Sequence, residues 1–330
     1  MKECNMMINN TLSICLTPKN LCIEQALKEA GVTDIASVSK LTISGTLTLR
    51  SFKYIQENMS KTLREFDIGN ALFSKGHIDI HDFSGFSKLS SIEVNPRNQM
   101  ISSHNGVVLS KRKKELIYCP PKRQADFVIP DSVKHIKCNA FADCEQITSI
   151  TIPETVTTID SGAFCGCSSL TSIVIPSSLN EIQSKTFYKC SSLTSIEIPM
   201  SVFSLGTSAF ENCIGLTSIN IPASVLSVGY SAFSNCIGLI YATISAKIIG
   251  LCAFSGCTSL KSVLISASVE EISNNAFHNC PAYFTVHPDN PVYESKNGKI
   301  THKQKRKQKT LLCSNTMITM PLRTSGQIKN

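Results

Sequence analysis

A repeat of 23 residues limits the possible folds of this chain more than any other feature. Ala-Phe, once Thr-Phe, recurs seven times, and each Phe is followed three residues later by a Cys. Five of the six intervals between successive Phe residues are 23 residues, and the interval from Phe233 to Phe254 is 21. A unit this short cannot bury its own apolar face, so the copies must stack and share one core. The Phe residues are Phe141, Phe164, Phe187, Phe210, Phe233, Phe254 and Phe277.

Each copy follows the pattern C-x-x-L-T-S-I-x-I-P-x-S-V-x-x-I-x-x-x-A-F. The Ile-x-Ile pair alternates apolar and free positions, which is typical of a strand with one buried face. Pro follows this strand in most copies and lacks the N–H that continued pairing requires. The second half has apolar spacings of three and four, which indicates a turn or a short helical segment. The sequence therefore predicts a β-rich leucine-rich repeat solenoid of the α/β class, with short parallel strands on the concave face and turns and short helical segments on the convex face.

The repeated Phe and Cys are predicted to be core residues. A side chain that recurs once per turn fills the same space in every turn, and buried Cys behaves as a small apolar residue. Zinc needs ligands that converge on one point, whereas one Cys per turn forms a line along the array. Segment 1–16 has no continuous apolar stretch typical of a signal peptide, so we expect reduced thiols. No cofactor and no resident metal are expected from these columns.

Weaker copies and inserted segments flank the regular array. The strand pattern L-x-x-L-x-L begins at Val38, Leu63 and Leu89, and Thr17-Pro18 and Gly31 frame a short helix ahead of them. Two later segments share an Asn-Gly turn and a basic tip, which predicts β-hairpins. The expected organisation is an N-terminal cap with a short helix (1–37), degenerate leading repeats (38–94), an inserted β-hairpin segment (95–126), regular repeats (127–286), a second hairpin-like segment with a basic tip (287–313) and an unassigned tail (314–330).

The repeat is similar to the BspA-like (Treponema-type) leucine-rich repeats, over roughly 89–313 and including the inserted segment 95–121. The resemblance implies a parallel-stranded solenoid without enzymatic activity, in proteins displayed on microbial surfaces that bind host matrix proteins or other cells. It thus implies a cell-surface or secreted location. The missing signal-peptide pattern leaves a cytoplasmic protein or an incomplete N-terminus as alternatives. The sequence also lacks a nucleophile elbow and a phosphate-binding glycine loop, so we expect no enzyme and no small-molecule substrate.

The outward positions of the strands are the first candidate site. In L-T-S-I-x-I the two Ile point inward, so the Ser before them and the residue between them point outward. One outward column is nearly all Ser and the other varies, which suits binding of a protein or cell-surface ligand; small polar residues that only keep the sheet soluble would look the same. Tyr241 is the first candidate for an anchor. The outward residues are Ser149 and Thr151, Ser172 and Val174, Ser195 and Glu197, Ser218 and Asn220, Tyr241 and Thr243, and Ser262 and Leu264.

Two charged segments suggest other binding modes. On a strand, His77, Asp79 and His81 would share one side and form a weak metal candidate, although no fourth ligand is identifiable and solvated edge residues would show the same pattern. The alternative function is an anion-binding module that uses the basic hairpins 111–123 and 299–309. Its ligand would be an acidic glycan, a phospholipid or nucleic acid, of which nucleic acid is the least expected. A charged, solvated hairpin tip would give the same pattern. Its candidate residues are Lys111, Arg112, Lys113, Lys114, Lys303, Lys305, Arg306, Lys307 and Lys309.

Net charge and hydropathy support this division of the chain. The net charge is +8, yet residues 131–280 hold 6 Lys and 10 Asp plus Glu, so the basic residues concentrate in the flanking segments. Residues 212–246 carry no charge and are long enough to span a bilayer, but they contain Pro222 and many Ser, Asn and Thr residues. We therefore expect no transmembrane segment.

Overall fold

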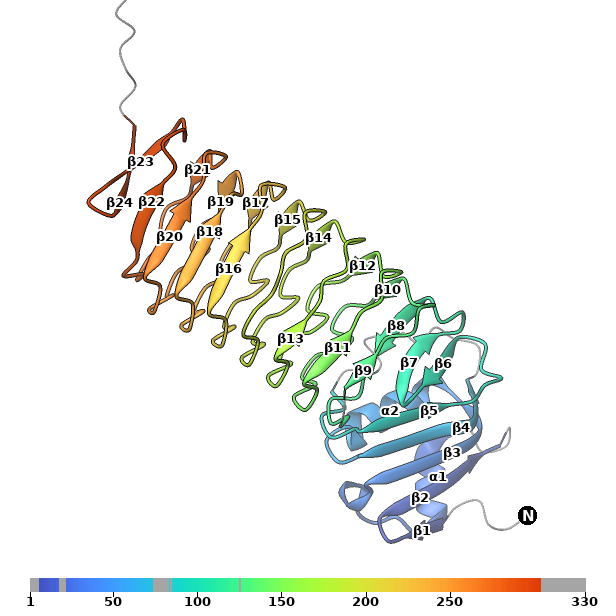
Figure 1. The fold of residues 1–330 in the computed structure, drawn as a ribbon. Coiled ribbons are helices and arrows are strands. Elements are labelled where there is room, and N and C mark those ends of the chain that lie inside the picture. The colour runs from blue at the N-terminus through green and yellow to red at the C-terminus, as the bar shows by residue number, and fades with distance from the viewer. Residues whose placement is uncertain (1–5, 18–21, 74–82, 84, 125, 304–330) are drawn as a thin grey trace, which may run out of the picture.

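The computed structural model describes residues 6–17, 22–73, 83, 85–124 and 126–303, which form one elongated solenoid of stacked strands (Figure 1). Buried apolar side chains form two contiguous clusters, one within residues 12–118 and one within 107–293. No helix among the described residues has the length and apolar character that crossing a membrane requires. The predicted repeat solenoid is confirmed.

The N-terminal part is a five-stranded sheet with the order β1-β2-β3-β4-β5. β1 and β2 are antiparallel, and all the later pairs are parallel. The three L-x-x-L-x-L patterns form β3, β4 and β5, with Leu41 opposite Phe66 and Phe66 opposite Ile92. Parallel pairing thus begins with β2, inside the segment from which only a cap was expected. The bounds are β1 (Met6–Ile8), β2 (Thr11–Leu16), β3 (Lys40–Leu47), β4 (Glu65–Phe73) and β5 (Ser91–Val94).

Helices lie beside this sheet (Figure 1). The expected first helix is present as α1 (Ile23–Glu29), but it begins after Cys22, and residues 18–21 lie outside the described residues. A 3-10 helix, η1 (Ile35–Ser37), precedes β3. The second helix, α2 (Leu49–Met59), was not expected; Thr48 caps it by accepting a hydrogen bond from the N–H of Ser51 (3.1 Å). The edge of the sheet at this end is β1 rather than a helix.

An antiparallel meander joins this sheet to the regular repeats. It consists of β6 (Ile101–His104), β7 (Val107–Ser110) and β8 (Glu115–Tyr118). Asn105 and Gly106 both have positive φ, as the tight turn between β6 and β7 requires. β8 then pairs in parallel with the first repeat.

Most regular repeats contribute to two parallel ladders, and each ladder is divided into two separate sheets. The first ladder is formed by the Ile-x-Ile segments, and the second by the two residues that follow the Pro turn. The first ladder contains β9 (Phe127–Val128), β11 (Ser149–Thr151), β13 (Ser172–Ile173), β16 (Ser218–Ile221), β18 (Tyr241–Ile244), β20 (Ser262–Ile265) and β22 (Tyr283–Val286). After β8, the second contains β10 (His135–Ile136), β12 (Thr158–Ile159), β14 (Glu181–Ile182), β15 (Ser204–Leu205), β17 (Ser227–Val228), β19 (Ile248–Ile249) and β21 (Glu271–Ile272).

The second ladder occupies the side where short helical segments were expected. The turn after the first strand closes when the N–H of Val156 donates to the carbonyl of Pro153 (3.0 Å), and the chain is extended at Ile159. Val156 and Ile159 are both buried. The spacing of three therefore reflects a turn followed by a strand, and the described part of 127–286 contains no helix.

The Ala-Phe turns stack along the solenoid. The N–H of Phe187 donates to the carbonyl of Ala209 (2.8 Å), and the N–H of Phe210 donates to that of Ala232 (2.7 Å). Neighbouring rings of the Phe column lie 5.0–5.4 Å apart, with interplanar angles of at most 24°. Phe277, the last of the column, is the one member that is only partly buried. The Phe column is core, as predicted.

The Cys column is also core, except that its last member, Cys280, is only partly buried, and its thiols donate hydrogen bonds to backbone carbonyls. The thiol of Cys213 donates to the carbonyl of Phe187 (3.1 Å), and that of Cys236 to the carbonyl of Phe210 (3.1 Å). Burial raises the pKa of Cys236 to about 12, so this thiol stays protonated near neutral pH. Every described cysteine is a free thiol.

The shortened repeat between Phe233 and Phe254 leaves both ladders in register. Ile221 lies opposite Ile244 in the first ladder, and Val228 lies opposite Ile249 in the second. The two missing residues therefore come from the turn that joins the two strands. The kink that the shortened spacing suggests does not interrupt either ladder.

The Phe column predicts a large stability difference between two phenylalanines. Phe187→Ala removes a ring that is 1% exposed and should lower the free energy of unfolding by about 3–5 kcal/mol. Phe203→Ala, at a ring that is 45% exposed, should lower it by less than about 1 kcal/mol. Urea unfolding followed by circular dichroism measures both. Equal losses would contradict the stacked core.

The raised pKa of Cys236 predicts loss of stability at alkaline pH. The thiol has an ordinary pKa of 9.0, so below that value both the folded and the unfolded chain are protonated. Between 9.0 and about 12 only the unfolded chain loses the proton, which should cost about 1.4 kcal/mol of stability per pH unit. The stability advantage of the wild type over Cys236→Ala should therefore shrink by about 2 kcal/mol between about pH 8 and about pH 10.5.

A matched core variant without a titrating group is the control for this pH effect. The cost of Val225→Ala, at a fully buried position, should be the same at both pH values. Urea unfolding at each pH provides the comparison. A pH-independent difference between the wild type and Cys236→Ala would show that the thiol titrates normally in the folded protein.

Candidate interaction face

The predicted outward residues lie on one side of the first ladder, which we call the strand face. The strand face comprises the twelve outward residues named from the sequence, together with Tyr283 and Thr285 on β22. All of them are exposed or half-exposed, while the apolar residues between them are buried, except Phe284, which is only partly buried. In the last four strands the register is continuous, because Ser218, Tyr241, Ser262 and Tyr283 are successive partners. The other column runs through Asn220, Thr243, Leu264 and Thr285.

Ser195 and Glu197 lie where the first ladder is interrupted. Residues 193–199 form no strand, so the ladder is divided between β13 and β16. The chain is still tied to both neighbours, since the N–H of Thr194 donates to Thr171 and the N–H of Thr217 donates to Thr194 (3.2 Å each). Both side chains remain exposed at this interruption.

Tyr283 was missed by sequence reasoning. Its repeat is two residues shorter between the column Cys and the strand, so the L-T-S-I pattern is not visible there. The signal is the alternation Tyr-Phe-Thr-Val, in which Phe284 and Val286 take the inward positions. Tyr283 is 60% exposed and Tyr241 is 58% exposed, so the strand face carries two exposed aromatic side chains in one column.

The Thr and Ser of the L-T-S segment have different roles. The hydroxyl of Thr171 donates to the carbonyl of Thr148 (3.2 Å), and the hydroxyl of Thr194 donates to that of Thr171 (3.3 Å). These Thr side chains thus support the ladder. Within the described residues, the neighbouring hydroxyls of Ser218 and Ser262 make no hydrogen bond to the protein, so they are available to a partner.

The two hairpins are copies of one module. In the first, the side-chain oxygen of Asn98 accepts from the N–H of Met100 (2.9 Å); in the second, that of Asn290 accepts from Val292 (2.9 Å). The second hairpin consists of β23 (Tyr293–Lys296) and β24 (Lys299–His302). It packs beside β22, where the N–H of Phe284 donates to the carbonyl of Gly298 (2.9 Å).

The basic residues of these hairpins have two kinds of environment. The ammonium group of Lys111 donates to the carbonyl of Pro96 (2.7 Å), and that of Lys303 donates to the carbonyl of Pro288 (2.9 Å). These two amines are therefore used within their own hairpins. Arg112, Lys113 and Lys114 are exposed at the tip between β7 and β8. Lys305, Arg306, Lys307 and Lys309 lie outside the described residues.

The metal candidate His77, Asp79 and His81 also lies outside the described residues. Within the part of the chain that the structure describes, no three His, Cys, Asp or Glu side chains come together to hold a metal ion.

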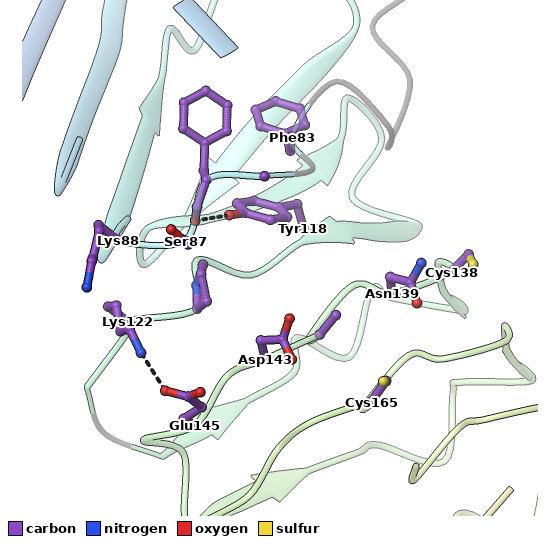
Figure 2. A pocket seen from close by; sticks show the side chains of 14 residues that line it. Phe83, Ser87, Lys88, Tyr118, Lys122, Cys138, Asn139, Asp143, Glu145 and Cys165 are labelled. Atoms are coloured by element: carbon purple, nitrogen blue, oxygen red, sulfur yellow. Dashed lines mark hydrogen bonds and ion pairs between the residues drawn. The ribbon is translucent and has the colours of Figure 1, made fainter. Parts of the chain in front are cut away.

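A cavity lies where the inserted meander separates two turns of the solenoid (Figure 2). Its volume is about 700 Å³, and the segment containing Ser87 and Lys88 faces Asp143 and Cys165, which lie on the Ala-Phe turns of two successive repeats. Lys122 and Glu145 form an ion pair (2.5 Å) at its rim. Burial raises the pKa of the Cys165 thiol, and the same effect raises that of Cys138, which makes both weak nucleophiles near neutral pH.

The sequence pattern of the family "BspA type Leucine rich repeat region" matches six copies in this chain, over residues 118–240 and 239–295. A comparison with curated proteins found no match. Among solved structures, a leucine rich cell surface protein from Faecalibacterium prausnitzii A2-165 is 28% identical, with a TM-score of 0.51. That match covers 62% of this chain and 53% of the other protein.

A leucine-rich repeat protein from Bacteroides ovatus ATCC 8483 is also 28% identical, with a TM-score of 0.43 and coverage of 58% of each chain. The chain thus spans between half and two thirds of the length of these two proteins. The family match itself covers more than half of the chain. Together with the two parallel ladders and the Phe and Cys columns, it shows that the chain belongs to the BspA-type leucine-rich repeat family.

Proposed function

We propose that the chain is a non-enzymatic interaction protein whose strand face binds a macromolecule at a cell surface. The observation that carries the proposal is the continuous register of exposed side chains along the last four strands. A partner that extends along the solenoid can contact several repeats at once, because equivalent positions lie about 4.8 Å apart in successive strands.

The structural neighbour from Faecalibacterium prausnitzii supports the surface part of this proposal. That protein is described as a leucine rich cell surface protein, and it shares the repeat fold with this chain. The family pattern supports binding over catalysis, since repeat proteins of this kind present extended surfaces. The side chains of the strand face are separated from the core by the strand backbone, so they can differ between repeats without disturbing packing.

A triple variant tests the strand face. Glu197→Ala, Asn220→Ala and Tyr241→Ala together remove exposed groups from three neighbouring repeats and should lower binding of the labelled protein to intact cells at least tenfold. The matched control changes three positions of the second ladder, Thr158→Ala, Glu181→Ala and Ser204→Ala. Flow cytometry measures binding, and circular dichroism verifies that both variants fold. Wild-type binding by the first variant would refute the strand face as the binding surface.

A further inference from the structure

We propose that the C-terminal half of the strand face, on β16, β18, β20 and β22, binds an uncharged sugar chain. This inference rests on the proposed function and names the chemistry of its partner. Three properties of these four strands support it: the absence of charge, the placement of two tyrosines, and the free hydroxyl groups between them.

Charge is absent from the outward positions of these strands. None of the eight outward residues on the four strands is Asp, Glu, Lys or Arg. A phosphate- or sulfate-rich partner would find no cation among these eight positions, and a basic partner would find no carboxylate; the exposed Lys261 and Lys296 lie at their border, and Lys296 is paired with Glu294. The nearest charged residue of the strand face, Glu197, lies one repeat towards the N-terminus. The partner that fits this surface is therefore neutral.

Tyr241 and Tyr283 stand in one column with Ser262 between them. Because adjacent strands are about 4.8 Å apart, the two tyrosines lie about 10 Å apart along the solenoid. Their other neighbour in the column, Ser218, is also small. The column therefore presents two aromatic side chains separated by a small serine, rather than one continuous apolar patch. Apolar C–H faces of sugar rings pack well on exposed aromatic rings of this kind.

The turn of the second hairpin holds the ring of Tyr283 in place. Gly298 packs so closely against this ring that a Cβ atom at position 298 would overlap it. Gly298 also has a φ of +72°, which glycine adopts without strain. One side of the ring is thus fixed by the β23–β24 turn while the residue stays 60% exposed. A ring held in this way loses little conformational entropy when a partner binds.

Hydroxyl and amide groups surround the two rings. Within the described residues, the side chains of Ser262, Asn220 and Thr243 make no hydrogen bond to the protein. They can donate to and accept from the hydroxyl groups of a sugar. A tight protein interface would instead need a desolvated apolar centre, and Leu264 is the one aliphatic residue among the eight outward positions. This combination favours a neutral glycan over a protein.

Titration calorimetry on the full chain tests the inference. The probes are linear neutral oligosaccharides of glucose, galactose or mannose, at about 50 mM and about 500 mM NaCl. We expect one class to bind with the same affinity at both salt concentrations. Tyr241→Ala and Tyr283→Ala should each weaken that binding about tenfold. Tyr230→Ala, at a tyrosine that is 52% exposed but lies outside the strand face, is the matched control and should leave the affinity unchanged.

Three results would overturn the glycan inference. They are no binding of any of these oligosaccharides, equal affinity in all three tyrosine variants, and binding only of sulfated oligosaccharides with loss at high salt. The cell-binding assay separates this failure from failure of the proposed function. If the strand-face triple variant abolishes cell binding but glycosidase treatment of the cells does not, the strand face is the binding surface and its partner is not a glycan. If glycosidase treatment removes binding of the wild type, the glycan inference is supported.

Discussion

The stacking of one turn on the next is the interaction on which the rest of this structure depends. Each regular repeat contributes a Phe ring to the column, with neighbouring centroids 5.0–5.4 Å apart. It also contributes a Phe carbonyl, which accepts a hydrogen bond from a Cys thiol of a neighbouring turn. A sulfur at this position fills space as a small apolar group and at the same time satisfies a buried carbonyl. The Phe and Cys columns recur together because each pair closes the contact between two turns.

The 23-residue period predicted the regular part of the fold well because equivalent residues of every repeat pack in equivalent environments. The strand position, the buried Phe and the buried Cys follow from one pattern that persists over seven copies. The second ladder did not follow, because a turn and a strand can produce the same spacing of three as a helix, as Val156 and Ile159 show. The sequence predicted β3, β4 and β5 from their L-x-x-L-x-L patterns, but β1, β2 and α2 are absent from the prediction because the N-terminal segments lack the Ala-Phe turn that marks the regular repeats. In the N-terminal part, Phe52 of α2 packs against Phe66 of β4, with ring centroids 6.0 Å apart, and fills the core as the column Phe residues do in the regular repeats.

The sequence predicted which side of the strands faces outward, but it predicted only part of the residues that form the strand face. Alternation in the strand identifies the outward positions, and ten of the twelve predicted residues lie in repeats where a strand forms. The ladder is interrupted at Ser195 and Glu197 although their repeat fits the pattern, and nothing in the sequence of that repeat indicates it. Tyr283 shows the reverse case. Its repeat departs from the sequence pattern, so it was not predicted, yet its strand pairs in register with β20. Pairing depends on the backbone of the neighbouring turn, which a single repeat does not encode.

The hairpin modules affect both the packing of the solenoid and the surface that it presents to a partner. A parallel ladder leaves an unpaired edge at its end, and such edges promote unwanted association. At β5 the N–H of Ile92 donates to the carbonyl of Gly106 (3.1 Å), and at β22 the N–H of Phe284 donates to that of Gly298. The hairpin turn thus covers the edge strand in both places. Because the covering residue is a glycine, the strand can carry a large outward side chain beside it, and Tyr283 occupies that space at β22 while Ser91 takes it at β5. The same turn therefore ends a ladder and sets how large a side chain the last strand can present to a partner.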